Sequence, residues 1–319
     1  MSCKRVYGMA TRDAYGKTLV ELGKENPHIV VLDADLSKST KSVFFAKEFK
    51  ERFFNMGIAE ANMVSTAAGL ASCGKIPFAS SFASFLMCKG FDQLRMSVAN
   101  SHLNAKFVGS HGGISIGEDG ASQMAVEDIA LACSLPGFVV LVPADEAATK
   151  ALVRLAARHI GPVYIRTGRP KTPIIYQPGT NFEIGKANIV REGIDITVIT
   201  NGLLVQEAIE AACICSRNGI DVRVIDMHTV KPVDVNAIVQ SASTTGAIVT
   251  AEEHLLSGGL GAAVAQVVTE HHPVPMGFIG LKDTYAESGT AEELLKKYGL
   301  TAEHIVAGIE KTVKKKTVL

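Results

Sequence analysis

Short runs rich in β-branched residues alternate with helix-length segments along most of this 319-residue chain. In its first half, strands are expected at 28–32, 52–54, 76–79, 105–108, 138–142 and 163–165, and helices near 11–24, 59–72, 82–99, 124–133 and 145–158. Strands separated by segments of helix length favour parallel βαβ units. The pattern therefore predicts an α/β fold built on doubly wound, mostly parallel sheets.

Residues 167–190 interrupt this alternation with three prolines and no clear period, which is typical of a linker. A second alternation follows, with strands expected at 196–200, 222–226, 247–251 and 276–279 and helices near 203–217, 234–242, 259–271, 291–297 and 302–315. We predict a first domain at 1–170, a linker at 171–190 and a smaller α/β domain at 191–319.

The balance of charges argues against several classes of function. The chain has 32 basic and 32 acidic residues, so it offers no electrostatic surface for nucleic acid or for an anionic membrane. No apolar run approaches the length that spans a bilayer, and the first residues show no apolar leader. The six cysteines form no CxxC pair, which fits a reducing compartment. We expect a cytoplasmic enzyme.

Candidate ligand-binding loops follow the predicted strands, because open parallel sheets bind ligands outside the carboxyl ends of their strands. The loop at 109–120 has five glycines, a histidine and an acidic pair among its twelve residues. Such a loop either cradles a ligand or simply turns tightly. A single loop histidine such as His111 is more often solvated or satisfied than catalytic. Composition alone leaves both readings open.

Charged residues near these loops have the same two readings. Glu60 is expected in the first turn of the helix at 59–72, where a carboxylate is ordinarily just a favourable terminal charge. Arg12 and Arg166 each adjoin a threonine and are candidate anion ligands, since arginine suits bidentate phosphate recognition. The standard phosphate-binding motifs are absent. A cluster at 252–254, Glu-Glu-His, is more simply explained as a strand-end loop.

Six segments in order resemble the second half of a transketolase. They are ATRDAYG (10–16), DADL with ST (33–36 and 39–40), GIAEANM (57–63), FASF with FDQLR (82–85 and 91–95), GSHGGISIGEDGASQ (109–123) and IRTGRP (165–170). The resemblance covers nearly all of the chain. It implies thiamine diphosphate bound between two subunits, with its pyrimidine side in this chain.

The resemblance also implies roles for individual residues. Glu60 matches the glutamate that hydrogen-bonds the aminopyrimidine ring and activates the cofactor, and His111 serves proton transfers. The cofactor-binding set is Asp35, Glu60, Phe85 and Phe91, and the substrate-binding set is Arg12, Ser39, His111, Asp119, Gln123 and Arg166. Arg12, Ser39 and Arg166 are expected to hold the sugar phosphate. His111 and Asp119 are expected to bind ketose hydroxyls.

This sequence departs from the family pattern in three places. Cys88 stands where many members have a third aromatic residue, and Gln123 replaces a histidine of bacterial and yeast members, as in the animal type. The Gly-Asp-Gly…Asn motif that holds the diphosphate and Mg²⁺ is missing, so no metal site is expected in this chain. The resemblance therefore implies the C-terminal subunit of a split transketolase, with Mg²⁺ on a separate N-terminal subunit.

The implied reaction transfers a two-carbon ketol unit from a ketose phosphate to an aldose, as in the pentose phosphate pathway. The implied assembly is a two-plus-two heterotetramer that self-associates through both domains of this chain. The alternatives are the beta subunit of a 2-oxo-acid dehydrogenase complex, which would not be expected to keep Arg12, Ser39 and Arg166, and a non-catalytic cofactor-binding subunit. Deoxyxylulose phosphate synthase shares the fold, but as one long chain.

Overall fold

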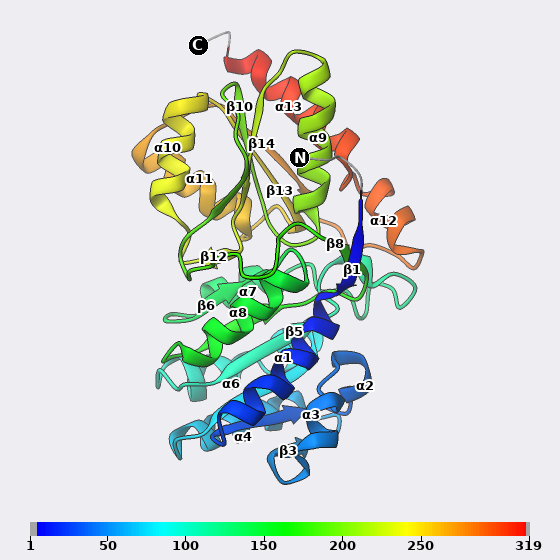
Figure 1. The fold of residues 1–319 in the computed structure, drawn as a ribbon, viewed down its shortest axis with the longest axis vertical. Coiled ribbons are helices and arrows are strands. Elements are labelled where there is room, and N and C mark those ends of the chain that lie inside the picture. The colour runs from blue at the N-terminus through cyan, green and yellow to red at the C-terminus, as the bar shows by residue number, and fades with distance from the viewer. Residues whose placement is uncertain (1–4, 317–319) are drawn as a thin grey trace.

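The chain forms two helix-covered sheets, which lie one above the other in Figure 1. The computed structural model describes residues 5–316. Cys3 and the other first residues, which were searched for a leader in the sequence, lie outside the described residues. Both sheets are mostly parallel, which confirms the predicted α/β class. Within the described residues, no helix combines the length and the apolar character needed to cross a membrane.

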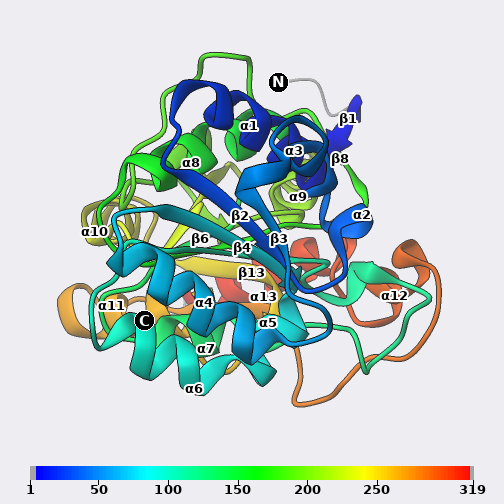
Figure 2. The same cartoon turned by 90° about the horizontal axis from the view of Figure 1, so that it is seen from below.

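The first sheet has seven strands in the order β12-β6-β7-β5-β4-β2-β3. Their bounds are β2 Ile29–Asp33, β3 Phe53–Asn55, β4 Ile76–Phe82, β5 Lys106–Ser110, β6 Val139–Leu141, β7 Val163–Arg166 and β12 Thr229–Lys231. Helices α1 (Thr11–Glu25), α3 (Val43–Glu48) and α8 (Glu146–Arg158) cover one face, and α4 (Glu60–Ser72), α5 (Ala83–Lys89), α6 (Phe91–Gln93) and α7 (Asp128–Ser134) cover the other (Figure 2). Every residue of β2 and β5 is buried, as expected of central strands between two helical layers.

The second sheet has five strands in the order β14-β13-β10-β11-β9. Their bounds are β9 Asn188–Arg191, β10 Ile196–Thr200, β11 Val222–Asp226, β13 Ile248–Leu255 and β14 Met276–Leu281. Helices α9 (Leu204–Arg217) and α13 (Ala302–Lys316) lie on one side and α10 (Val235–Thr245) and α11 (Leu260–His271) on the other, with α12 (Ala291–Lys297) at the edge (Figure 1). Strands β1 (Tyr7–Ala10) and β8 (Lys171–Pro173) form a separate antiparallel pair.

The two halves interlock more closely than the sequence indicates. Strand β12 belongs to the second half of the chain but pairs antiparallel with β6 at the edge of the first sheet. The predicted linker holds β8 and the start of β9. These pairings depend on partners far away in sequence, which local patterns do not report. The predicted domain limits therefore remain a prediction.

The helix expected at 82–99 is broken in the structure. It forms α5, then α6, then a π-helical turn at Leu94–Ala99. The break is at Gly90, where a Cβ would lie 2.8 Å from the Leu86 carbonyl oxygen and 3.0 Å from the Val64 side chain on α4. A glycine lets α4 and this segment approach closely. That contact places the end of α5 beside the start of α4.

Candidate active site at the carboxyl ends of the first sheet

The candidate residues gather where the parallel strands of the first sheet end. Glu60 follows β3, Ser81 lies at the end of β4, His111 follows β5 and Arg169 follows β7. Because these strands are parallel neighbours, their carboxyl ends share one edge of the sheet. The fold therefore assembles a polar site from segments about 110 residues apart in the chain.

Glu60 is a buried carboxylate with a lysine against it. Its side chain is only 2% exposed at the start of α4. The Ser81 hydroxyl donates a hydrogen bond to Oε1 at 3.1 Å, and Lys89 Nζ lies 3.4 Å from Oε2. The same ammonium lies 4.2 Å from the centroid of the Phe85 ring, as a cation–π contact. One half-exposed lysine thus covers both the carboxylate and the ring face.

Aromatic rings join this carboxylate to the histidine loop. Phe82 stacks on Phe85 at 5.6 Å between centroids and contacts the His111 ring at 4.1 Å. The residue assignments implied by the resemblance did not include Phe82. In the structure it ends β4, where it pairs with Ser110 of β5, and its ring contacts both the Phe85 ring and the His111 ring.

His111 is buried and held in one tautomer. Its Nε2 lies 2.9 Å from Arg12 Nη1 and its Nδ1 lies 2.8 Å from Ser110 Oγ. A guanidinium can only donate, so Nε2 accepts and the ring proton is on Nδ1. Burial, and then the charges of Arg12, Arg169 and Lys41, lower the pKa of His111 from its ordinary 6.5 to about 3. The imidazole is therefore neutral at physiological pH.

We expect the His111 ring to stay neutral in the folded chain down to about pH 4, as read from its ring resonances by NMR titration. In the unfolded chain the ring takes up its proton near the ordinary value of 6.5. Its contribution to stability is therefore complete above that pH and is lost as pH falls toward about 3. A ring that titrates near 6.5 in the folded chain would contradict the buried geometry. The exposed His272 serves as the control.

Arg12 contacts His111, Arg169 contacts the histidine loop, and Lys41 pairs with Asp13, the residue after Arg12. Arg12 donates to the Ser39 carbonyl oxygen at 3.2 Å. Arg169 donates to the Ile116 carbonyl oxygen at 2.6 Å, and its ion pairs are to Glu118 at 3.1 Å and Asp119 at 3.6 Å. Burial lowers the pKa of Arg12, the adjacent Asp13 carboxylate opposes this shift, and the charge of Arg169 adds to it. This cluster is suited to bind an anion.

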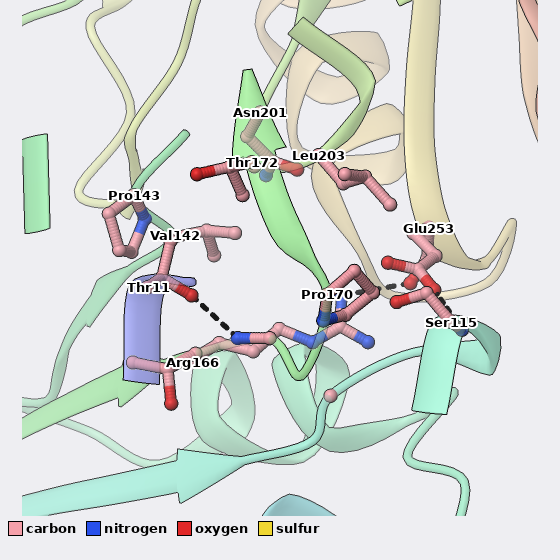
Figure 3. Close-up of a pocket in the computed structure, with 14 residues that line it drawn as sticks. Thr11, Ser115, Val142, Pro143, Arg166, Pro170, Thr172, Asn201, Leu203 and Glu253 are labelled. Atoms are coloured by element: carbon pink, nitrogen blue, oxygen red, sulfur yellow. Dashed lines mark hydrogen bonds between the residues drawn. The ribbon is translucent and has the colours of Figure 1, made fainter. Parts of the chain in front are cut away.

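Arg166, predicted to hold the sugar phosphate, is buried and packs against Gly112 of the histidine loop, and its role stays a prediction. It is 5% exposed and lines a cavity of about 40 Å³ between the two halves of the chain (Figure 3). Its guanidinium donates to the carbonyl oxygens of Glu253 at 2.8 Å and Ala125 at 2.7 Å, and Nε lies 3.2 Å from Asp128 Oδ2. These contacts commit it to the interface. Arg169, three residues later in the same IRTGRP segment, contacts the histidine loop at Ile116, and its charge lowers the pKa of His111.

The other predicted residues are placed as follows. Asp35 is exposed and exchanges two hydrogen bonds with Asn55, which join the loops after β2 and β3. The Gln123 carbonyl oxygen accepts a hydrogen bond from Ser84 on α5. Phe91 is partly buried against the core on the α4 side. Their roles remain predictions.

The Glu-Glu-His cluster lies inside β13 and not in a strand-end loop, and two of its members bind the starts of helices. Glu252 accepts hydrogen bonds from the Leu260 and Gly261 amides at the start of α11. His254 accepts one from the Ala130 amide at the start of α7, which lies in the first half of the chain. The helix expected at 124–133 begins at Asp128, where this histidine caps it. Within residues 5–316, no three histidine, cysteine or acidic side chains are grouped so that they could hold a metal ion.

Comparison with known proteins gives a consistent match. Residues 7–174 match the family described as transketolase, pyrimidine binding domain, and residues 185–305 match transketolase, C-terminal domain. A putative transketolase C-terminal section of Methanocaldococcus jannaschii is 47% identical over 95% of this chain and 96% of its own length. The 6-deoxy-6-sulfo-D-fructose transketolase subunit SqwH of a Clostridium species is 40% identical over 96% and 95%.

A solved structure described as split gene transketolase, inactive beta4 tetramer, superimposes with a TM-score of 0.91 at 51% identity, over 97% of this chain and all of that one. By contrast, this chain spans only 49% of the length of the mouse and human transketolase-like proteins that it matches. The similarity therefore extends over the whole length of the C-terminal section, the subunit and the split-gene chain, but over only about half the length of the transketolase-like proteins.

Proposed function

Because the chain belongs to the transketolase family, we propose that it is the subunit of a split transketolase that holds the pyrimidine side of thiamine diphosphate and the sugar substrates. The proposed reaction transfers a two-carbon ketol unit from a ketose phosphate to an aldose. One observation carries the proposal. Lys89 contacts both the buried Glu60 carboxylate and the Phe85 ring, and one further ring, Phe82, separates Phe85 from the neutral His111.

The residues present fit the cofactor's aminopyrimidine. Lys89 satisfies Glu60 with an N–H donor and covers the Phe85 ring with positive charge. An aminopyrimidine offers a ring nitrogen that can share one proton with the carboxyl group, and a flat polar face that stacks on an aromatic ring. It can therefore take the place of the ammonium without leaving a buried carboxylate unpaired.

Thiamine diphosphate, when bound, supplies the nucleophilic carbon and the electron sink for ketol transfer. Glu60 then holds or releases a proton at the ring nitrogen, with its carboxylate oriented by Ser81. Phe85 fixes the plane of the ring by stacking. His111 presents a neutral Nε2, which can accept a proton from a substrate hydroxyl once an anion draws Arg12 away.

The anion-binding arm of the site is assigned to Arg12, Lys41 and Arg169. Arg12 contacts His111, Arg169 contacts the histidine loop at Ile116, and Lys41 pairs with Asp13, the residue after Arg12. The charges of all three lower the pKa of His111. A sugar phosphate bound there would place its phosphate on the guanidinium groups and its hydroxyls toward the histidine loop. Arg169 takes the role first assigned to Arg166, while Ser39 contributes its carbonyl oxygen to orient Arg12.

We propose that a separate N-terminal chain supplies the diphosphate site and Mg²⁺, in a two-plus-two assembly. The proposal is supported by the relatives that match over their whole length, whose names include a C-terminal section, a subunit and a split gene. Self-association would use α4, whose solvent side carries short residues that allow close helix packing: Asn62, Ser65, Gly69 and Ser72. Ile58, 79% exposed beside Glu60, would then be covered.

The test is to mix the purified chain with an N-terminal chain that carries the Gly-Asp-Gly…Asn motif and to measure ketol transfer from xylulose 5-phosphate. The beta subunit of a 2-oxo-acid dehydrogenase would instead support decarboxylation of a 2-oxo acid. A non-catalytic subunit would support neither reaction. The cationic cluster around His111 favours the sugar phosphate reaction.

Replacing Lys89 by methionine is expected to tighten thiamine diphosphate binding to the assembled enzyme about 5- to 30-fold. The cofactor must displace the ion pair that the half-exposed Lys89 makes with Glu60 and one cation–π contact, each worth about 0.5–1 kcal/mol. Isothermal titration measures the affinity, with the exposed Lys186→Met as the matched control. Unchanged or weaker binding in the Lys89 variant would mean that the lysine stays beside the bound ring.

A further inference from the structure

The loop that carries His111 donates a hydrogen bond to one carboxylate in the second half of the chain. Glu253 lies in β13 and is 7% exposed. Its Oε1 accepts a hydrogen bond from the Ser115 amide at 2.6 Å, and Figure 3 shows this contact beside the Arg166 side chain. Gly113 lies so close that a Cβ there would collide with the Glu253 carboxyl group. The contact is therefore direct and closely packed.

The segment that this contact holds has an unusual backbone. His111 has a φ of 61° and Gly113 a φ of 83°. A residue other than glycine rarely adopts positive φ, and it keeps it only where the surroundings fix it. Three backbone donors after His111 do so. The Gly112 amide donates to the Thr167 carbonyl oxygen at 3.1 Å, the Gly113 amide to that of Ala125 at 2.8 Å, and the Ser115 amide to Glu253.

Only the last of these three acceptors belongs to the second half of the chain, and only this one is a side chain. Glu253 is itself fixed, because Arg166 donates to its carbonyl oxygen at 2.8 Å and pairs with Asp128 on the other side. Burial raises the pKa of Glu253, against the opposing effects of Arg166 and the Ser115 amide. A carboxyl group is costly to bury unless its hydrogen bonds are made. Here they are made to the histidine loop.

We propose that Glu253 is a positioning residue for His111. It acts through the Ser115 amide, holding the turn at 111–115 in the conformation that directs the imidazole toward Arg12 and Phe82. This inference rests on the proposed function only for its catalytic consequence. It gives the second half of the chain a specific task at a site whose reacting groups all come from the first half.

The test compares Glu253→Gln with Glu253→Leu in the assembled enzyme. Glutamine keeps an acceptor oxygen at the same reach, whereas leucine has similar size and no acceptor. We expect kcat within about 3-fold of wild type for glutamine and about 100-fold lower for leucine, since a misplacement of about 1 Å can cost that much. The affinity for thiamine diphosphate should not change, because Glu60 and Phe85 lie outside the turn. The exposed Glu270→Leu is the control.

A second readout needs no activity. In the isolated chain, NMR titration of His111 should give a pKa near the wild-type value for glutamine and a higher one for leucine, because release of the turn exposes the ring. If Glu253→Leu folds poorly, Gly113→Ala takes its place, because it breaks the same contact from the loop side and should also raise the pKa of His111. The inference would be overturned if the wild type is active and Glu253→Leu keeps both the wild-type kcat and the wild-type titration of His111. A wild type without ketol transfer would instead overturn the proposed function.

Discussion

Replacing Glu60 by glutamine is expected to lower ketol transfer by the assembled enzyme about 10²- to 10⁴-fold, the range lost with a general acid–base group. Glutamine can still accept the Ser81 hydrogen bond and fills the same volume, so the fold should persist. It cannot exchange a proton with the aminopyrimidine ring. The loss should therefore fall on kcat, with little change in the KM of the sugar phosphate.

The matched control for this variant is Glu51→Gln, an exposed glutamate in the turn before β3. Its activity should equal that of the wild type. Glu60→Gln removes the ion pair with Lys89. Adding Lys89→Met to Glu60→Gln should therefore tighten thiamine diphosphate binding less than Lys89→Met does in the wild type, and the difference measures the contribution of the ion pair. Undiminished ketol transfer in Glu60→Gln would show that Glu60 is an ordinary buried helix-start carboxylate.

Arg166→Met is expected to lower the free energy of unfolding by about 3–5 kcal/mol, because it leaves Asp128 buried without its cation. Two carbonyl oxygens, of Glu253 and Ala125, also lose their donors. Since these groups lie between the two halves of the chain, the loss should appear as a lower unfolding midpoint in urea. The binding of a sugar phosphate should change only as far as the fold does.

Arg169→Met provides the opposite result from the same segment. Its ion pairs to Glu118 and Asp119 are partly exposed, so the expected loss of stability is below about 1 kcal/mol. The KM for a phosphorylated ketose should rise about 10- to 100-fold, as for the loss of a hydrogen bond to a charged group. A large KM effect in Arg166→Met at unchanged stability, with none in Arg169→Met, would restore the assignment made from the sequence.

The positions of these two arginines show where sequence reasoning reached its limit. Both belong to one family-like segment, and a side chain's burial cannot be read from its neighbours in the chain. Arg166 ends β7 and is directed toward the interface, while Arg169 lies past the strand and reaches the histidine loop. The distinction depends on how the second half of the chain covers the first. That contact is made by Glu253, more than eighty residues away.

The fold itself was largely predictable, because the central strands are short, wholly buried and separated by helices. Strands β2, β10 and β11 and helices α1, α8 and α12 lie within a residue of the expected limits. The elements that were missed, such as β1, β8 and β12, are short strands stabilised by distant partners. Phe82 was also missed as a site residue, and its place depends on the pairing of the end of β4 with β5.

The central claim is that this chain supplies half of a transketolase active site. The most direct measurement is ketol transfer from xylulose 5-phosphate to an aldose phosphate, assayed with this chain alone, with the N-terminal chain alone and with the two mixed, in the presence of thiamine diphosphate and Mg²⁺. The account predicts activity only in the mixture, and its loss when Glu60→Gln replaces the wild type. Full activity from this chain alone, or an active mixture that tolerates Glu60→Gln, would contradict it.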